Sequence, residues 1–351
     1  MSEARVILAE MVDRLFADHV DMDLLSATKA GHWAHDLWAV VEQQGLPSSL
    51  VPEQRGGMGA SFHDAYVIVR AAGRYRVPLP LPETIAADWL LAAAGLDLPT
   101  GPLTIAGVHP EDTLRLYRSG SQWRLSGSIH HVAWGRIANS IVLSLRHDEK
   151  TLIVQVPRRG CVVACAANLA GEFRDTLTFD DHAVEVASWN SAVAYNPVTV
   201  IGGLMRSGLM AGALADVLAR SVAYAGERQQ FGRSIGKQQA VQQNLAILAE
   251  EAAAAAAAAE AAFVAFDRAD PEFRVAVAKT RAGLAASQAV AIAHQVHGAI
   301  GYALEHPLHA STLRLISWRS EFGSDRHWAI VLGRRVLALG ADDFWPHITA
   351  N

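Results

Sequence analysis

The chain has 351 residues, 51% of them hydrophobic and 19% charged, and its 30 basic and 35 acidic residues give a formal net charge of −5. This apolar content excludes a disordered chain, and the lack of a basic run argues against nucleic-acid binding. Two cysteines are too few for a disulfide framework, and no uncharged apolar run reaches the ~18 residues that span a membrane. The first residues carry acids at helical spacing, unlike a targeting peptide. We therefore expect a soluble, cytoplasmic, α-rich protein that binds neither nucleic acid nor membrane.

The first 192 residues divide into two segments. Residues 1–100 carry apolar residues at three- and four-residue spacing, punctuated by Pro and Gly, which predicts an N-terminal helical domain. Residues 101–192 contain short runs such as LTIAGV, SIVLSL and TLIVQV, with Gly, Pro and Asp between them. Runs of this kind predict a small antiparallel β domain.

Longer helices are predicted in the remaining segment, residues 193–351. Helical periodicity covers Leu204 to Tyr224, Gln238 to Phe266, Glu272 to His297 and Trp328 to Leu339. The Asp-Pro pair just before the third run is a helix-start signal, and the alanine-rich second run has high helix propensity. Helices of this number and length indicate an antiparallel C-terminal bundle.

Familiar nucleophile, phosphate-loop and zinc motifs are missing from the sequence, and its 15 histidines are scattered, so we expect no metal site. A polar loop stands out between two predicted helices. It contains Arg228, Gln230 and Phe231, with Gln239 downstream. Such a loop is either a solvated turn or an anion clamp, in which Arg pairs with a pyrophosphate and Phe stacks beside an aromatic base.

Two further elements are rich in glycine. The segment QVHGAIGY, Gln295 to Tyr302, ends a predicted helix. Here Gly298 either caps the helix or lets the backbone approach a ligand, with Gln295 as the polar contact. The segment from Val51 to Gly59 is interpreted as a tight connection, because Glu53 is its one reactive group.

Four pieces of the sequence match patterns of one known family, in the same order. They are Leu37-Trp38 with Gly45-Leu46 and Val51 to Gly59; Gly73-Arg74 with Pro78, Pro80, Glu83 and Thr84; Arg228, Gln230, Phe231, Gly232 and Gln239; and Gln295, Gly298, Ala299, Gly301 and Tyr302. Together they resemble the acyl-CoA dehydrogenase family over nearly the whole chain. The resemblance implies that family's fold, which is mainly α with a central β domain: an N-terminal helical domain, a small antiparallel β domain and a C-terminal four-helix bundle.

The resemblance also implies a chemistry. Members of the family bind FAD and oxidise an acyl-CoA thioester to its trans-2-enoyl form: a carboxylate removes the α proton, and the β hydrogen leaves as hydride to the flavin. Most relatives pass the electrons to an electron-transferring flavoprotein. In the family, one subunit holds the ADP end of its neighbour's FAD. The positions that carry this role over to the present chain are Arg228, Gln230, Phe231, Gln239, Gln295, Gly298 and Ala299.

The catalytic base of the family is missing from both of its usual places. Counting on from Gln295 puts Phe322 at the usual position of a glutamate, with Glu321 one residue earlier. Some relatives carry the base on the first helix of the bundle instead, and there this chain has Gly202 and Gly203. Glu321 is a candidate base, but a one-residue shift in a turn redirects the side chain, and the alternative is a solvated carboxylate.

The β domain also departs from the family pattern. His131 and Ala133 stand where a Trp and a Thr usually lie beside the flavin ring, and the acidic-Gly-Ser-Asp segment before them is absent. The chain thus keeps the residues that hold a neighbour's FAD and lacks those that hold the flavin ring and supply the base.

This division leads to the hypothesis that the chain resembles the base-lacking subunit of bacterial α2β2 acyl-CoA dehydrogenases, enzymes that act on steroid and other bulky acyl-CoAs. A partner subunit would then supply the base. Two alternatives stay open: a self-sufficient homo-oligomeric dehydrogenase that uses Glu321, and a non-redox binding or scaffold member of the fold.

Overall fold

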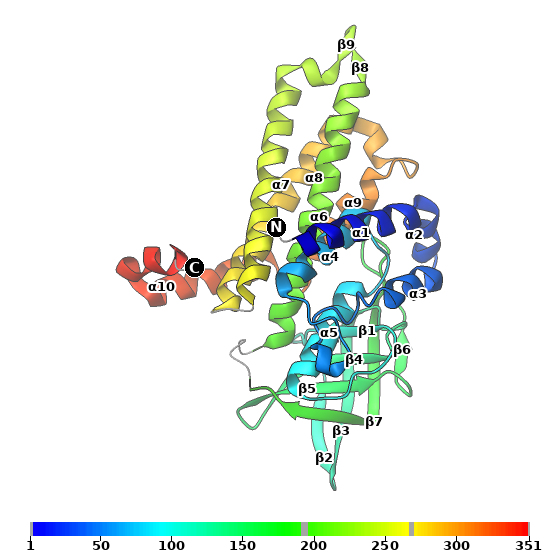
Figure 1. Cartoon of the computed structure of the whole chain (residues 1–351), viewed down its shortest axis with the longest axis vertical. Helices are drawn as coiled ribbons and strands as arrows, with labels where there is room; N and C mark the ends of the chain where they lie inside the picture. The colour runs from blue at the N-terminus through cyan, green and yellow to red at the C-terminus, as the bar shows by residue number, and fades with distance from the viewer. Residues whose placement is uncertain (1–2, 191–195, 267–269, 350–351) are drawn as a thin grey trace.

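The computed structural model describes residues 3–190, 196–266 and 270–349. Helices come first, strands follow, and longer helices return after the last long strand (Figure 1). The N-terminal elements are α1 (Glu3–His19), α2 (Met22–Lys29), α3 (His35–Gln43), η1 (Glu53–Arg55), α4 (Phe62–Tyr75) and α5 (Leu81–Ala94). The central strands are β1 (Leu103–Ala106), β2 (Arg115–Ser119), β3 (Gln122–Ala133), β4 (Ser140–His147), β5 (Lys150–Pro157), β6 (Val162–Ala164) and β7 (Arg174–Ser188).

The C-terminal part is built from long helices. Its elements are α6 (Pro197–Glu227), β8 (Gln229–Gln230), β9 (Arg233–Ser234), η2 (Ile235–Lys237), α7 (Gln239–Phe266), α8 (Pro271–His297), η3 (Gly298–Tyr302), α9 (Leu308–Ser320) and α10 (Asp325–Thr349). Figure 1 shows the β8–β9 hairpin at the end of this bundle that lies farthest from the sheet. The element order confirms the predicted fold class, mainly α with a central β domain.

The sheet is mixed, which corrects the expectation of a purely antiparallel β domain. Its order is β1-β4-β5-β7-β3-β2, with β6 on β7, and β1 runs parallel to β4. The other pairs are antiparallel. The physical reason is the path of the chain between the two strands. The β2–β3 hairpin lies between β1 and β4 in sequence, and after it the chain returns to pair β4 with β1 in the same direction. Strand composition alone does not encode this direction.

The core of the helical parts is continuous, whereas the strands have a second core of their own. One apolar cluster joins α1, α4 and α5 to the bundle helices, and another lies within the strands. Because the first cluster crosses from the N-terminal helices into the bundle, these two parts pack as one body.

Helix α6 lies at the centre of this body. It begins at Pro197, with the Asn196 side chain accepting a hydrogen bond from the backbone N–H of Thr199, a standard N-cap. Glycines let α4 and α6 approach backbone to backbone: a Cβ on Gly212 would overlap the carbonyl oxygen of Arg70, and a Cβ on Gly73 would overlap that of Leu209. By length and composition α6 could cross a membrane, but 89% of its most apolar window is buried inside the protein.

Candidate functional site

The two positions from which a base would act lie against each other in space. Phe322 lies in the turn between α9 and α10, and a Cβ on Gly202 of α6 would overlap its ring. The ring also lies 3.7 Å from the position of a Cβ on Gly107, which follows β1. Phe322 has a φ of 50°, a left-handed conformation that is costly for a bulky residue, and its carbonyl accepts a hydrogen bond of 2.9 Å from Trp328 Nε1. An aromatic ring therefore occupies the point where a carboxylate would act.

Glu321, the candidate base, points into a set of arginines. Its Oε1 accepts a 2.7 Å hydrogen bond from Arg174 Nε, and its Oε2 accepts a 2.6 Å hydrogen bond from Arg206 Nε. The side chain is 17% exposed. Although burial acts in the opposite direction, the two guanidinium groups lower the pKa of Glu321 to about 2. A carboxylate held in this way has little tendency to accept a proton near neutral pH.

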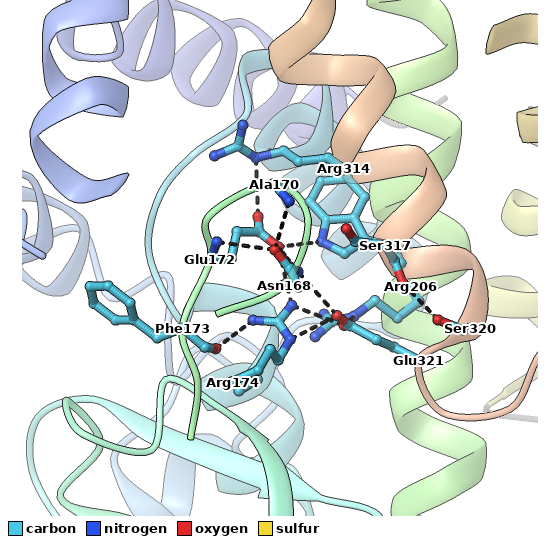
Figure 2. Close-up of polar contacts among 12 residues, drawn as sticks. Asn168, Ala170, Glu172, Phe173, Arg174, Arg206, Arg314, Ser317, Ser320 and Glu321 are labelled. Atoms are coloured by element: carbon cyan, nitrogen blue, oxygen red, sulfur yellow. Dashed lines mark hydrogen bonds and ion pairs between the residues drawn. The ribbon is translucent and has the colours of Figure 1, made fainter. Parts of the chain in front are cut away.

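These contacts belong to a longer ionic chain at the meeting point of the three parts (Figure 2). In it, acidic and basic side chains alternate. The order is Glu83, Arg206, Glu321, Arg174, Glu172 and Arg314. Asn168 and the indole N–H of Trp318 also donate hydrogen bonds to Glu172. Each buried charge therefore has an opposite charge and hydrogen bonds beside it, the condition under which buried ions are tolerated.

Lys279, on α8, packs against the end of α9 next to this ionic chain. It is buried, and its Nζ donates hydrogen bonds to the carbonyl oxygens of Trp318 at 3.0 Å and Arg319 at 3.3 Å, at the end of α9. Burial, with a smaller effect of Arg206, lowers the pKa of Lys279 to about 7. Lys279 thus adds hydrogen bonds to two carbonyl groups in the last turn of α9, one of which, that of Trp318, also accepts from the backbone N–H of Glu321.

The predicted anion clamp is an exposed hairpin at the far end of the bundle. Arg228, Gln230 and Phe231 are all exposed, and the Phe231 ring is 93% exposed. Gln239 is the first residue of α7 and is exposed as well. Within residues 3–190, 196–266 and 270–349, the guanidinium of Arg228 has no carboxylate partner. A cation without a carboxylate partner and an uncovered aromatic ring, three positions apart in the chain, suit a ligand with a phosphate and a base.

The second predicted element lies at the same end of the bundle. Gln295, Gly298 and Ala299 are exposed at the end of α8 and the start of η3. Gly298 has a φ of 63°, and a Cβ there would meet nothing within 4 Å. The rings of Tyr224 and His297 stack with centroids 4.5 Å apart, which joins the ends of α6 and α8. The two elements therefore follow helix ends that pack against each other, and their exposed residues are of types that could hold the ADP part of FAD.

The flavin-ring side of the β part does not show the same fit. His131 is exposed with a φ of 57°, whereas Ala133 is buried. Asp112, in the segment before β2, binds His130 through a 2.8 Å contact between Oδ1 and Nδ1 instead of facing outward. The chain thus exposes the hairpin and the end of α8 that match the family's ADP-binding motifs, while His131, Ala133 and Phe322 stand at the positions that the resemblance assigns to the flavin ring and the base.

Sequence reasoning missed the ionic chain. Arg174 and Glu321 are 147 positions apart, and Arg206 and Glu83 are 123 apart. Of its members, Glu83 appears in a matched motif, but no local spacing shows that it pairs with α6. A weak signal was available, because an arginine at position 206 inside an otherwise apolar helix needs a buried partner.

Comparisons with known proteins agree with this geometry. Two family models match the chain: acyl-CoA dehydrogenase, N-terminal domain, over residues 2–96, and acyl-CoA dehydrogenase, C-terminal domain, over residues 202–337. The acyl-CoA dehydrogenase IpdE2 of Mycobacterium tuberculosis (strain ATCC 25618 / H37Rv) is 28% identical over 310 residues, which cover 88% of this chain and 89% of that protein.

Solved structures share the fold. A chain of the ChsE4–ChsE5 complex from Mycobacterium tuberculosis has a TM-score of 0.86 at 22% identity, over 97% of this chain and 99% of that chain. A variant of the Tcur3481–Tcur3483 steroid ACAD has a TM-score of 0.88 at 23% identity, over 96% of this chain and 98% of that chain. With family models on both helical parts and the same fold throughout, the chain belongs to the acyl-CoA dehydrogenase family.

Proposed function

We propose that this chain is the non-catalytic subunit of a heteromeric FAD-dependent acyl-CoA dehydrogenase. It would hold the ADP part of the FAD, and a second subunit of the same fold would supply the base. The observation that carries this proposal is the Phe322 ring against Gly202, because it fills the one point that both base positions share. The neighbouring carboxylate, Glu321, is occupied by Arg174 and Arg206.

The reaction proposed for the complex is the α,β-desaturation of an acyl-CoA thioester. FAD, when bound, would accept the β hydrogen of the substrate as a hydride. The α proton must pass to a carboxylate placed at the substrate α-carbon, and this chain has none at that point. Its own contribution is therefore binding and orientation: Arg228 would pair with the pyrophosphate, Phe231 would lie against the adenine, and Gln295 with Gly298 would line the other side.

The exposure of these residues supports a role between subunits. Phe231 is 93% exposed, so almost nothing among the described residues of its own chain covers it. A partner that brings FAD to the hairpin would bury both the ring and the cofactor. We infer that the partner is a second acyl-CoA dehydrogenase subunit, since a structural neighbour of this chain is a complex of two different chains, ChsE4 and ChsE5.

The substrate is inferred from the same neighbours. The Tcur3481–Tcur3483 complex is a steroid ACAD, and its fold matches 96% of this chain. We propose a bulky, steroid-derived acyl-CoA as the substrate of the complex, and an electron-transferring flavoprotein as the electron acceptor, as in most members of the family.

The first test is a visible absorption spectrum with a mass measurement in solution. The chain alone, mixed with FAD and passed over a desalting column, should be colourless. The tagged chain isolated from its native host together with its partner should show flavin bands near roughly 370 and 450 nm. A yellow homo-oligomer of the chain alone would overturn the proposal in favour of a self-sufficient enzyme. A complex without flavin would favour a scaffold role.

A further inference from the structure

Four histidines and two tyrosines gather at the end of the bundle that carries the cofactor-binding surface, and the proposed function does not explain them. We call them the histidine–tyrosine cluster; its members are Tyr224, His294, His297, Tyr302, His306 and His309. They come from α6, α8, η3, the segment between η3 and α9, and the start of α9. No group of three or more metal-ligating side chains within the described residues could hold a metal ion, so the cluster is not a metal site.

The rings are in direct contact. Tyr224 and His297 stack at 4.5 Å with planes 22° apart, and His306 packs edge-on against His297 at 4.9 Å. His294 and Tyr302 form a second stack at 4.2 Å. Aromatic pairs in such geometries stabilise the fold beyond the apolar area that they bury. The cluster thus joins the ends of α6 and α8 to η3 and to the segment before α9.

The hydrogen bonds fix which nitrogen of His297 carries its proton. Nδ1 lies 2.8 Å from the carbonyl oxygen of Ala293, and since a carbonyl can only accept, Nδ1 must be the donor. The neutral ring therefore has an unprotonated Nε2. His297 is 3% exposed, and Nε2 has no hydrogen-bond partner within the part of the chain that the structure describes. A second proton on this ring would be buried without an acceptor.

The groups around His297 also oppose a positive charge. Arg220 on α6 faces His297 and His306, and its own partner is Asp216, at 2.9 Å. His294 on α8 and His309 on α9 lie in the same cluster, and the remaining neighbours are the phenol rings of Tyr224 and Tyr302. Burial lowers the pKa of His297, against the hydrogen bond to the Ala293 carbonyl, which raises it, and Arg220 adds a smaller lowering effect. Burial also lowers the pKa values of His294 and His306.

Each side of the Tyr224–His297 stack leads directly into one half of the cofactor-binding surface. The carbonyl of Tyr224 accepts a 2.8 Å hydrogen bond from the backbone N–H of Arg228, the last turn before the hairpin. On the other side, His297 is followed at once by Gly298 with its φ of 63°. A change in the stack therefore shifts both halves together.

We propose that neutral His297 is the positioning residue that holds the two halves of the cofactor-binding surface in register, and that its protonation releases them. The consequence for FAD rests on the proposed function; the release of the two segments does not. Because the pKa of His297 is lowered, the stability it contributes is present above the ordinary histidine value of about 6.5 and is lost as the pH falls below it. Acidification should loosen the hairpin and η3 without unfolding the bundle.

The test is amide hydrogen exchange on the full chain at about pH 7.5 and pH 5, corrected for intrinsic exchange rates. Protection of residues 226–236 and 297–303 should fall together by about tenfold or more at the lower pH. The amides around Gly212, at the buried crossing of α4 and α6, should keep theirs and so report that the fold is intact. His297→Phe retains a stacking ring that cannot be protonated, and it should abolish the fall.

Two further results make the outcome decisive. His35→Phe, at an exposed histidine on α3, is the matched control and should behave like the wild type. Unchanged protection in the wild type at pH 5, or an equal fall in His297→Phe, overturns the proposal. A parallel calorimetric titration with ADP at pH 7.5 tests the cofactor surface itself. No binding there counts against the proposed function, while the exchange data still decide the role of His297.

Discussion

Phe322 and Gly202 are the two positions that the family resemblance assigns to a catalytic base. In this chain the Phe322 ring fills the space that a side chain on Gly202 would need. The Arg206 guanidinium lies 5.3 Å from the centre of the same ring, so a cation–π contact adds to the packing. The Phe322 ring is therefore held between Gly202 and the guanidinium of Arg206.

A glutamate at position 322 tests whether the base is all that the chain lacks. We expect Phe322→Glu to give no acyl-CoA oxidation in the isolated chain, because His131 and Ala133 also replace the residues beside the flavin ring. Phe322→Gln is the uncharged control of equal size. The assay is dye reduction with FAD and a panel of straight-chain and steroid-derived acyl-CoAs. Turnover by Phe322→Glu alone would show a self-sufficient site that had merely lost its base.

Asp88 on α5 is a buried carboxyl group outside the ionic chain. It is 8% exposed, its Oδ1 has no hydrogen-bond partner among the described residues, and burial raises its pKa to about 7. Between pH 3.8 and 7 the folded state holds the proton more tightly than the unfolded state does. Stability should therefore decrease as the pH rises through this range and level off above it.

The substitution Asp88→Asn removes this dependence. At pH 8 the variant should be more stable than the wild type by roughly 2–4 kcal/mol, and at pH 4 the difference should nearly vanish. Urea unfolding at both pH values measures it. Asp97→Asn, at an exposed carboxylate just after α5, is the control and should change little at either pH. A pH-independent difference would show that Asp88 is charged in the folded state.

Two glycines of α6 differ in the space that an added methyl group would find. In α6, Gly212 lies where the backbones of α4 and α6 meet, whereas Gly226 has nothing within 4 Å of a built Cβ. Gly212→Ala should force the helices apart and destabilise the chain by about 3 kcal/mol or more. Gly226→Ala, in the same helix, should be neutral or slightly stabilising because alanine favours a helix. Thermal unfolding of the pair measures the contrast; equal effects would mean that α4 and α6 can separate freely.

The sequence predicted an element correctly where a local pattern, such as helical periodicity, marked it. The run from Gln238 to Phe266 became α7, which begins at Gln239, and the run from Glu272 became α8, which begins at Pro271. The parallel pairing of β1 and β4 was not predictable, because strand direction depends on the path of the chain between them. The hairpin and the end of α8 were found through motifs, but their placement at one end of the bundle required the helices to be assembled.

At the scale of the whole molecule, the ionic chain links parts that the sequence keeps far apart. It connects α5, α6, the start of β7, α9 and the turn that carries Phe322. Figure 2 shows its part from Arg206 to Arg314. Sequence reasoning could not find the pairs that Glu321 makes with Arg174 and Arg206, or that Arg206 makes with Glu83, because these partners lie over a hundred positions apart. We therefore expect the helical and β parts to unfold in a single transition.

Glu321→Gln tests this link. The change leaves Arg174 and Arg206 buried with less compensating charge, and it should cost about 3–5 kcal/mol and lower the melting temperature by several degrees. Because the pKa of Glu321 is lowered to about 2, its contribution is present above its ordinary value of 4.5 and lost as the pH falls toward 2. Calorimetry of the variant against Glu250→Gln, at an exposed site on α7, measures it. Equal stability would mean that the network is dispensable.

The burial of α6 has a consequence for how the chain is made. This helix is apolar enough to cross a membrane, and it leaves the ribosome after α4 but before α7 and α8, which cover its other faces. A nascent chain halted before α8 would therefore expose a long apolar helix. Chaperone capture of stalled chains should peak at that length and cease once α8 has emerged, so the order of synthesis sets the moment of greatest risk.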